Sequence, residues 1–188
     1  MNVYDFDNTL YRGESGVQMF FFYLRKRPGL IRYAPQVIRA VIEYKRGKVD
    51  FNEAITRVGA ILKPFLEGIE DYNADAVAFW DKHERRLYPF YKPLQQPDDL
   101  IISASPEQSL KEICGRIGVR NYIGTVINEE TSTMEFACFR QNKVKAFQER
   151  YPGQGIDDFY TDSINDKPLM DLAKRVFLAD KGKITQIK

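Results

Sequence analysis

The stretch Asp5-Phe6-Asp7-Asn8-Thr9-Leu10 directly follows the short apolar lead Met1-Asn2-Val3-Tyr4. Side chains alternate along a strand, so Asp5 and Asp7 point to one side if the extended geometry continues past Asp5. Two carboxylates about 4 Å apart repel by roughly 4 kcal/mol at an effective dielectric constant near 20. A fold tolerates this repulsion only with a cation or a shared proton, and hard oxygen ligands suit Mg²⁺ better than zinc. The alternative interpretation is an Asx-rich turn after a strand.

Three further segments carry polar residues at places where an apolar run ends. In residues 159–166, an apolar and aromatic run leads into Asp162, and Asp166 follows four residues later. Between the two acidic loops, the apolar residues 100–102 end in Ser103. Ser105 and Pro106 then have the positions of an N-cap and a first helical residue, which predicts a helix whose free N–H groups form an anion site. Further along the chain, Lys143 opens an amphipathic run.

This ordered set of motifs resembles the haloacid dehalogenase superfamily of phosphatases, over nearly the whole chain. Asp5-Phe6-Asp7-Asn8-Thr9 is similar to the first motif of that superfamily, Asp-x-Asp-x-Thr. Ser103 matches the Ser or Thr that ends the second motif, and Lys143 matches the lysine of the third. Asp162 and Asp166 match the fourth, acidic motif.

The resemblance implies a role for each residue. Asp5 is expected to be the nucleophile that forms an aspartyl-phosphate, and Asp7 the general acid for the leaving group and then the general base for water. Mg²⁺ is expected to bind Asp5, the backbone carbonyl of Asp7 and Asp162. Asp166 is expected either to bind the metal through water or to brace Lys143.

Physical chemistry supports such a site independently. A phosphomonoester dianion resists attack by a carboxylate, and Mg²⁺ together with Lys143 would neutralise the transferring phosphoryl group. Ser103 and nearby N–H groups, including that of Ala104, would bind the phosphoryl oxygens. An aspartate close to other carboxylates has a raised pKa, which suits Asp7 as a proton donor.

Composition limits the classes of function. The chain has 188 residues, 44% of them hydrophobic, which is enough for one packed core with a modest insertion. A formal net charge of +2 is too small to indicate a nucleic-acid partner, and Cys114 and Cys138 lack zinc-ligand spacing. Because cleavage of a signal peptide would remove Asp5, we expect a cytoplasmic enzyme.

Periodicity divides the chain into two parts. Residues 14–89 have consecutive helical patterns, including one over residues 30–46, and we predict that they form an all-helical cap, called here the cap segment. Residues 1–13 and 90–188 are predicted to form the catalytic core. Strands and helices alternate from Asp98 onward, which predicts an α/β fold with a Rossmann-like, mostly parallel sheet. The active site of such a sheet lies at the carboxyl ends of its strands.

The cap segment stands where the phosphoserine-phosphatase branch of the superfamily has its cap. Residues 46–54 are similar to part of that cap, and Arg57 follows at the expected offset. By this resemblance, Arg57 binds a substrate carboxylate. Glu14, nine residues after Asp5, binds a substrate ammonium group.

Part of the cap segment departs from this branch. Phe20-Phe21-Phe22-Tyr23-Leu24 is followed by Arg25-Lys26-Arg27 and by the basic amphipathic pattern over residues 30–46. This composition suits a membrane surface or a lipid phosphate head group, although the apolar run is too short to span a bilayer. The favoured interpretation is the interior of a helical cap.

Three functional hypotheses follow. The first is a Mg²⁺-dependent phosphatase of a small phosphorylated metabolite, with phosphoserine as one candidate. The second is a phosphatase of a lipid-linked or amphiphilic phosphate that docks through the aromatic and basic cap segment. The third is a non-catalytic phosphate-binding module. The pattern predicts neither the substrate nor the oligomeric state.

Overall fold

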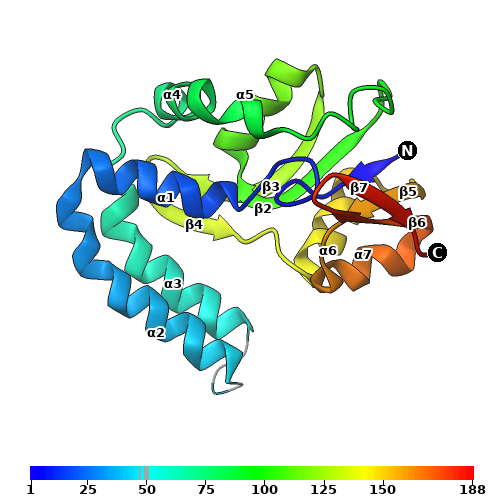
Figure 1. The fold of residues 1–188 in the computed structure, drawn as a ribbon. Helices are drawn as coiled ribbons and strands as arrows, with labels where there is room; N and C mark the ends of the chain where they lie inside the picture. The colour runs from blue at the N-terminus through cyan, green and yellow to red at the C-terminus, as the bar shows by residue number, and fades with distance from the viewer. Residues whose placement is uncertain (47, 49–50) are drawn as a thin grey trace.

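The computed structural model describes residues 1–46, 48 and 51–188. Within them, one seven-stranded sheet has the strand order β4-β3-β2-β1-β5-β6-β7 (Figure 1). Neighbouring strands are parallel except for the two edge pairs, β3–β4 and β6–β7, which are antiparallel. The strands are β1 Val3–Tyr4, β2 Leu100–Pro106, β3 Asn121–Asn128, β4 Thr133–Phe136, β5 Ile156–Thr161, β6 Ala173–Asp180 and β7 Lys183–Gln186. The predicted mostly parallel α/β fold is confirmed.

Helices lie in the connections between these strands, except between β3 and β4 and between β6 and β7, which short turns join. The α-helices are α1 Ser15–Lys26, α2 Ala34–Lys45, α3 Phe51–Leu66, α4 Tyr72–His83, α5 Glu107–Ile117, α6 Gln141–Arg150 and α7 Lys167–Leu172. The 3₁₀ turns are η1 Pro28–Tyr33, η2 Glu84–Arg86 and η3 Ile164–Asp166. Helices α1 to α4 all lie between β1 and β2 in the chain, within the residues predicted to form the cap segment. The exact division at residues 13/14 and 89/90 stays a prediction.

Both faces of the sheet are buried, and the alternation of side chains along each strand explains how. Tyr4 and Ile101 pack in a core with residues of α1, α4 and α5. Val3 and Ile102 pack in a second core with residues of α6 and α7. A parallel sheet covered on both sides requires apolar residues at successive strand positions, which is why β1 and the first half of β2 read as unbroken apolar runs.

The cap segment is divided between two kinds of packing. Helices α2 and α3 project from the body of the molecule as a hairpin (Figure 1). Helix α4 instead packs beside α5, where the fully buried Trp80 donates its indole N–H to the Ser109 carbonyl over 2.9 Å. Trp80 also meets the Phe6 and Tyr11 rings edge to face. The loop that follows β1 is therefore held by α4.

Two predicted helices differ in the structure. The pattern over residues 30–46 is split between the 3₁₀ turn η1, which begins at Pro28 and ends at Tyr33, and α2, which begins at Ala34. The helix expected from Pro106 starts at Glu107 as α5, and Ser105 does not cap it. Strand β2 continues through Pro106, and the Ser105 hydroxyl donates to Asp7 instead. Of the segment 46–54, residues 47, 49 and 50 lie outside the described residues.

Candidate active site

The loop after β1 carries both predicted acidic residues of the first motif. Asp5 directly follows β1, is 7% exposed, and accepts a 3.3 Å hydrogen bond from the Thr9 hydroxyl. The backbone reverses at Asn8, which has a left-handed φ of 57°, a conformation that asparagine tolerates better than most residues. The N–H groups of Leu10 and Tyr11 then both bond to the Phe6 carbonyl. This tight turn fixes the direction of the Asp5 carboxylate.

Lys143 on α6 contacts one acidic residue from the N-terminal part of the chain and one from the C-terminal part. Its Nζ lies 2.7 Å from Asp5 Oδ1 and 2.8 Å from Asp166 Oδ1, and all three side chains are buried. The Thr161 hydroxyl at the end of β5 donates to Asp166 over 2.9 Å. Burial raises the pKa of Asp5 despite the neighbouring ammonium of Lys143, and Asp166 and Asp7 add to the rise. One lysine therefore contacts two buried carboxyl groups.

Asp7 is held by two donors that the sequence analysis did not assign to the site. The Ser15 backbone N–H at the start of α1 donates to Asp7 Oδ1 over 2.8 Å, and the Ser105 hydroxyl donates to Asp7 Oδ2 over 3.0 Å. Ser15 and Ser105 also bond to each other through their hydroxyls at 2.8 Å. Burial raises the pKa of Asp7 to about 6, while the Ser15 and Ser105 hydrogen bonds oppose the rise. A carboxyl with this pKa can carry a proton near neutral pH.

These groups line one polar cavity of about 140 Å³ at the carboxyl ends of β1, β2 and β5. Ser103 on β2 is buried there, and its Oγ accepts the Ser105 N–H over 3.1 Å, which leaves the Ser103 hydroxyl proton available to a ligand. The cavity is lined by Asp5, Asp7, Glu14, Ser103, Ala104, Phe139, Lys143, Asp162, Ser163, Asn165 and Asp166. Segments far apart in the sequence therefore converge on one site.

The two predicted substrate-binding charges lie in different places. Glu14 lines the cavity, and the Asn8 side-chain amide donates to it over 2.6 Å. Arg57 lies on α3, where its guanidinium pairs with Glu43 at 2.9 Å and with Glu53 at 2.6 Å. Arg57 is not one of the described residues that line the polar cavity. Its pair with Glu43 joins α3 to α2, and its pair with Glu53 lies within α3.

The oxygen donors of the cavity fit a hard divalent cation. Asp5, Asp7, Asp162 and Asp166 all supply carboxylate oxygens, the ligand type that Mg²⁺ prefers. Burial raises the pKa of Asp162, and the nearby Glu14 adds to the rise. Within the described parts of the chain, no three acidic, histidine or cysteine side chains are close enough to form a ready-made metal cluster. A metal here would therefore need backbone carbonyls or waters among its ligands.

A model of the haloacid dehalogenase-like hydrolases matches residues 3–171, which include every one of these loops. The chain belongs to this hydrolase family. The resemblance noted from the four motifs is confirmed for the family as a whole.

Solved structures of this hydrolase fold resemble the chain at low sequence identity. A Bordetella pertussis Tohama I protein of unknown function has a TM-score of 0.70 and 19% identity, over 94% of this chain and 87% of its own. A phosphoserine phosphohydrolase-like protein from Francisella tularensis has a TM-score of 0.61 and 18% identity, over 94% of this chain and 86% of its own. The comparison with curated proteins finds no match. At these identities, the likeness shows the haloacid dehalogenase fold alone.

Proposed function

We propose that this chain is a Mg²⁺-dependent phosphatase that hydrolyses small phosphomonoesters through an aspartyl-phosphate on Asp5. The observation that carries the proposal is the shared polar cavity, in which Asp5, Asp7, Ser103 and Lys143 face one phosphate-sized space. The family membership and the phosphoserine phosphohydrolase-like neighbour support it.

The reaction divides into two balanced steps. An oxygen of Asp5 attacks phosphorus, the bond from phosphorus to the substrate alcohol breaks, and Asp7 gives its proton to the departing alcohol. Water then attacks the phosphorus of the aspartyl-phosphate and gives a proton to Asp7, the bond from phosphorus to the Asp5 oxygen breaks, and inorganic phosphate leaves. Lys143 and Ser103 hold the phosphoryl oxygens in both steps.

Asp5, the Asp7 backbone carbonyl and Asp162 are the groups proposed to hold Mg²⁺. When bound, the metal would neutralise phosphoryl oxygens and the excess carboxylate charge. Asp166, which contacts Lys143 at 2.8 Å, is proposed to brace that lysine. A water-mediated contact between Asp166 and the metal is compatible with this role.

Glu14 is proposed to contact a cationic or hydroxyl group of the substrate, because it lines the polar cavity. Phosphoserine is one candidate substrate that fits such a contact. A carboxylate-binding role for Arg57 would require this arginine to leave Glu43 and Glu53, with which it is paired here. The geometry thus supports a contact between Glu14 and a substrate ammonium group more than a contact between Arg57 and a substrate carboxylate.

A phosphomonoester panel with released phosphate as the readout tests the proposal. We expect hydrolysis of aryl and alkyl monophosphates with Mg²⁺ and its loss with excess EDTA. Asp162→Ala should raise the Mg²⁺ concentration needed for half-maximal rate by about tenfold or more. An unchanged Mg²⁺ titration in that variant would remove Asp162 from the ligand set. No turnover of any ester would favour the third hypothesis, a non-catalytic phosphate-binding module.

Ser105→Ala tests how Asp7 is held. Without the Ser105 hydroxyl the pKa of Asp7 should rise, because a donor to its charged form is lost. Since Asp7 must be protonated in the first step, the fall of kcat/KM at alkaline pH should move to higher pH. The maximal rate should drop roughly three- to tenfold, as expected when one hydrogen bond is lost. Ser105→Thr keeps the hydroxyl and should restore both values, whereas an unmoved pH profile in Ser105→Ala would contradict this role.

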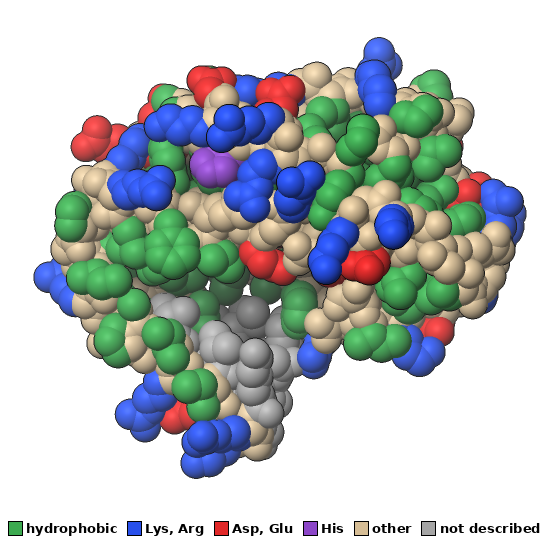
Figure 2. All heavy atoms as spheres, in the orientation of Figure 1, with side chains coloured by type: hydrophobic (Ala, Val, Ile, Leu, Met, Phe, Trp, Pro, Cys, Tyr) green, Lys and Arg blue, Asp and Glu red, His purple; other side chains and the backbone are tan. Residues whose placement is uncertain are grey.

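A second candidate function is hydrolysis of a lipid-linked or amphiphilic phosphate at a membrane surface. Large apolar side chains are exposed on α1, η1 and α2, among them Phe21 at 56%, Ile31 at 59% and Ile38 at 58%. Figure 2 shows hydrophobic and basic side chains intermixed over this part of the molecule. None of the helices in the described residues combines the length and apolar character needed to cross a bilayer. Contact with lipid would therefore be interfacial.

Sedimentation with vesicles tests the second candidate. The chain should pellet with vesicles rich in anionic lipid at low salt and be released at high salt. Phe21→Ser combined with Ile38→Ser should abolish pelleting, while Leu172→Ser, at an exposed apolar residue on α7, should not. Failure of the wild-type chain to pellet with any vesicle would exclude this candidate and leave the first one standing.

A further inference from the structure

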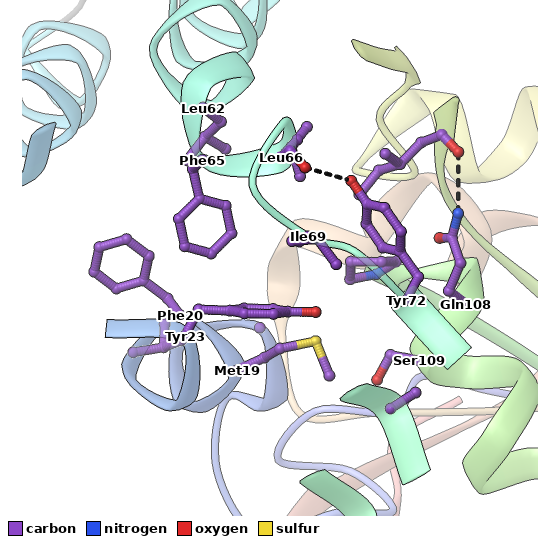
Figure 3. A pocket seen from close by; sticks show the side chains of 15 residues that line it. Met19, Phe20, Tyr23, Leu62, Phe65, Leu66, Ile69, Tyr72, Gln108 and Ser109 are labelled. Atoms are coloured by element: carbon purple, nitrogen blue, oxygen red, sulfur yellow. Dashed lines mark hydrogen bonds between the residues drawn. The ribbon is translucent and has the colours of Figure 1, made fainter. Parts of the chain in front are cut away.

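A second cavity, of about 330 Å³, lies between the cap segment and the core. Side chains of Met19, Phe20 and Tyr23 on α1 and of Phe65 on α3 point toward one another across it (Figure 3). Ile69, in the connection to α4, completes this side, and residues of β2, α5 and β3 form the opposite wall. Its volume is more than twice that of the polar cavity.

The wall of this cavity is apolar. Among the described residues no charged side chain lines it. The Tyr72 hydroxyl donates to the Leu66 carbonyl over 3.2 Å, and the Gln108 side-chain N–H donates to the Ile127 carbonyl over 3.0 Å. Gln108 Oε1 is a buried acceptor without a partner among the described residues, so it could receive a hydroxyl proton but would repel an anion. A hydrocarbon chain suits this wall, and a charged ligand does not.

The linings of the two cavities are separated by a pair of hydrogen-bonded serines, Ser15 and Ser105. In the segment 14–16, Glu14 lines the polar cavity and Gly16 lines the apolar one, with Ser15 between them. The segment 104–106 has the same arrangement: Ala104 lines the polar cavity and Pro106 lines the apolar one, with Ser105 between them. The 2.8 Å contact between the hydroxyls of Ser15 and Ser105 therefore marks the boundary.

The departing alcohol of the proposed reaction would lie at this boundary. Asp7, the proposed proton donor to that alcohol, accepts its hydrogen bonds from Ser15 and Ser105. The polar cavity of about 140 Å³ is well below the roughly 300 Å³ of a small ligand site, so the hydrocarbon part of a longer alcohol would extend beyond it. Gly16 leaves room for this, since a Cβ at that position would meet nothing within 4 Å.

We propose that the apolar cavity binds an aliphatic chain of the leaving alcohol, so that the preferred substrates are phosphomonoesters of amphiphilic alcohols. This inference rests on the proposed phosphatase function. A volume of about 330 Å³ corresponds to roughly ten water-sized units, which accommodates a chain of about eight to ten carbons.

A series of linear alkyl monophosphates from ethyl to octyl, kept below micelle-forming concentrations, tests the proposal. For a chain that enters an apolar site, kcat/KM should rise by up to about fourfold per methylene. Octyl phosphate should then exceed butyl phosphate by on the order of 100-fold. Because the substrates are monomeric and no vesicle is present, the series is independent of membrane docking.

Two variants test whether the alkyl chain of the substrate binds in the apolar cavity. Leu62→Gln adds a polar group at a partly buried wall position, and Gly16→Val places a branched side chain beside Ser15, where the lining of the apolar cavity begins. Each should lower the ratio of octyl to ethyl phosphate kcat/KM by about tenfold or more, as expected if two or more methylenes are no longer buried. Leu94→Gln makes the same exchange at an exposed leucine outside the cavity and should keep the wild-type ratio.

The outcomes separate the inference from the function on which it rests. Hydrolysis that does not depend on chain length would overturn the inference and leave the phosphatase function intact. A rise with chain length that Leu62→Gln and Gly16→Val both leave unchanged would also overturn it, since the chain would then bind elsewhere. No hydrolysis of any ester, with Mg²⁺ present, would overturn the proposed function and the inference together.

Discussion

Replacing Asp5 with asparagine is expected to abolish phosphate release, with a loss in kcat of about 10⁴-fold or more. The amide oxygen is a far weaker nucleophile than a carboxylate, and no second carboxylate among the described residues of the cavity occupies the same position against Lys143. Asp166 contacts the other side of that lysine and is held by the Thr161 hydroxyl, so it cannot take over the attack without losing that bond. Phosphate release from an aryl phosphate, with single-turnover detection of the phosphorylated chain, measures the effect.

This loss should not come from unfolding. Burial raises the pKa of Asp5, which means that its charged form costs stability at neutral pH. The side-chain amide introduced by Asp5→Asn carries no charge, and Lys143 keeps its pair with Asp166, so the variant should melt at the wild-type temperature or above. Asp171→Asn, at an exposed aspartate on α7, is the matched control and should retain full activity. More than a few per cent of wild-type turnover in Asp5→Asn would exclude Asp5 as the nucleophile.

Lys143→Met is expected to reduce turnover by about 10³-fold and to destabilise the fold. Lys143 is 3% exposed, and its ammonium pairs with Asp5 at 2.7 Å and Asp166 at 2.8 Å. Its loss removes a preorganised positive charge from the transferring phosphoryl group. It also leaves two buried carboxylates without their cation, which should lower the free energy of unfolding by about 3 kcal/mol at pH 7. Urea denaturation followed by circular dichroism, beside the phosphate assay, measures both effects.

The destabilisation in Lys143→Met should depend on pH with a definite sign. Lys143 opposes the rise in the pKa of Asp5, so without it that pKa rises further. A carboxyl whose pKa is raised by folding stabilises the protein most at a pH below its unfolded value, about 4, and this stabilisation is lost as pH increases through the folded value. The variant should therefore approach wild-type stability near pH 4 and fall behind it toward pH 7. Equal stability of the two chains at pH 7 would contradict the buried ion-pair geometry.

Lys167→Met is the matched control for this experiment. Lys167 pairs with Asp171 at 2.7 Å on the surface of α7, where the two side chains are 63% and 62% exposed. An exposed pair of this kind contributes about 0.5 kcal/mol or less. The control should keep both wild-type activity and wild-type stability across the same pH range.

Much of the fold and the centre of the site could be predicted from the sequence, because both depend on short-range pattern. Apolar runs that end in Asp5, Ser103 and Asp162 are buried parallel strands, and the carboxyl ends of such strands meet at one edge. The spacing of these motifs therefore predicts convergence without coordinates. The position of Lys143 opposite Asp5 followed from the family resemblance.

Other features could not be predicted because they depend on long-range packing. Ser105 has the sequence context of an N-cap, but the side chain bonds to Asp7, 98 residues away, because β2 continues past it. Arg57 matches a substrate-binding arginine by local offset, but the α2–α3 hairpin supplies Glu43 and Glu53 as its partners. Local sequence defines which kinds of group a side chain can bind, and its neighbours in the tertiary structure determine which group it contacts.

By itself, the sequence determined the α/β class, the order of the strand-end motifs and most of the charged groups that line the polar cavity, since periodicity and motif spacing are local properties. Only the tertiary structure decided that Ser15 and Ser105 hold Asp7 and that an apolar cavity adjoins this pair. The physical reason is that a cavity is the space left between elements distant in the chain. Met19, Phe65 and Ile127 come from three such elements, and no single segment encodes the gap between them.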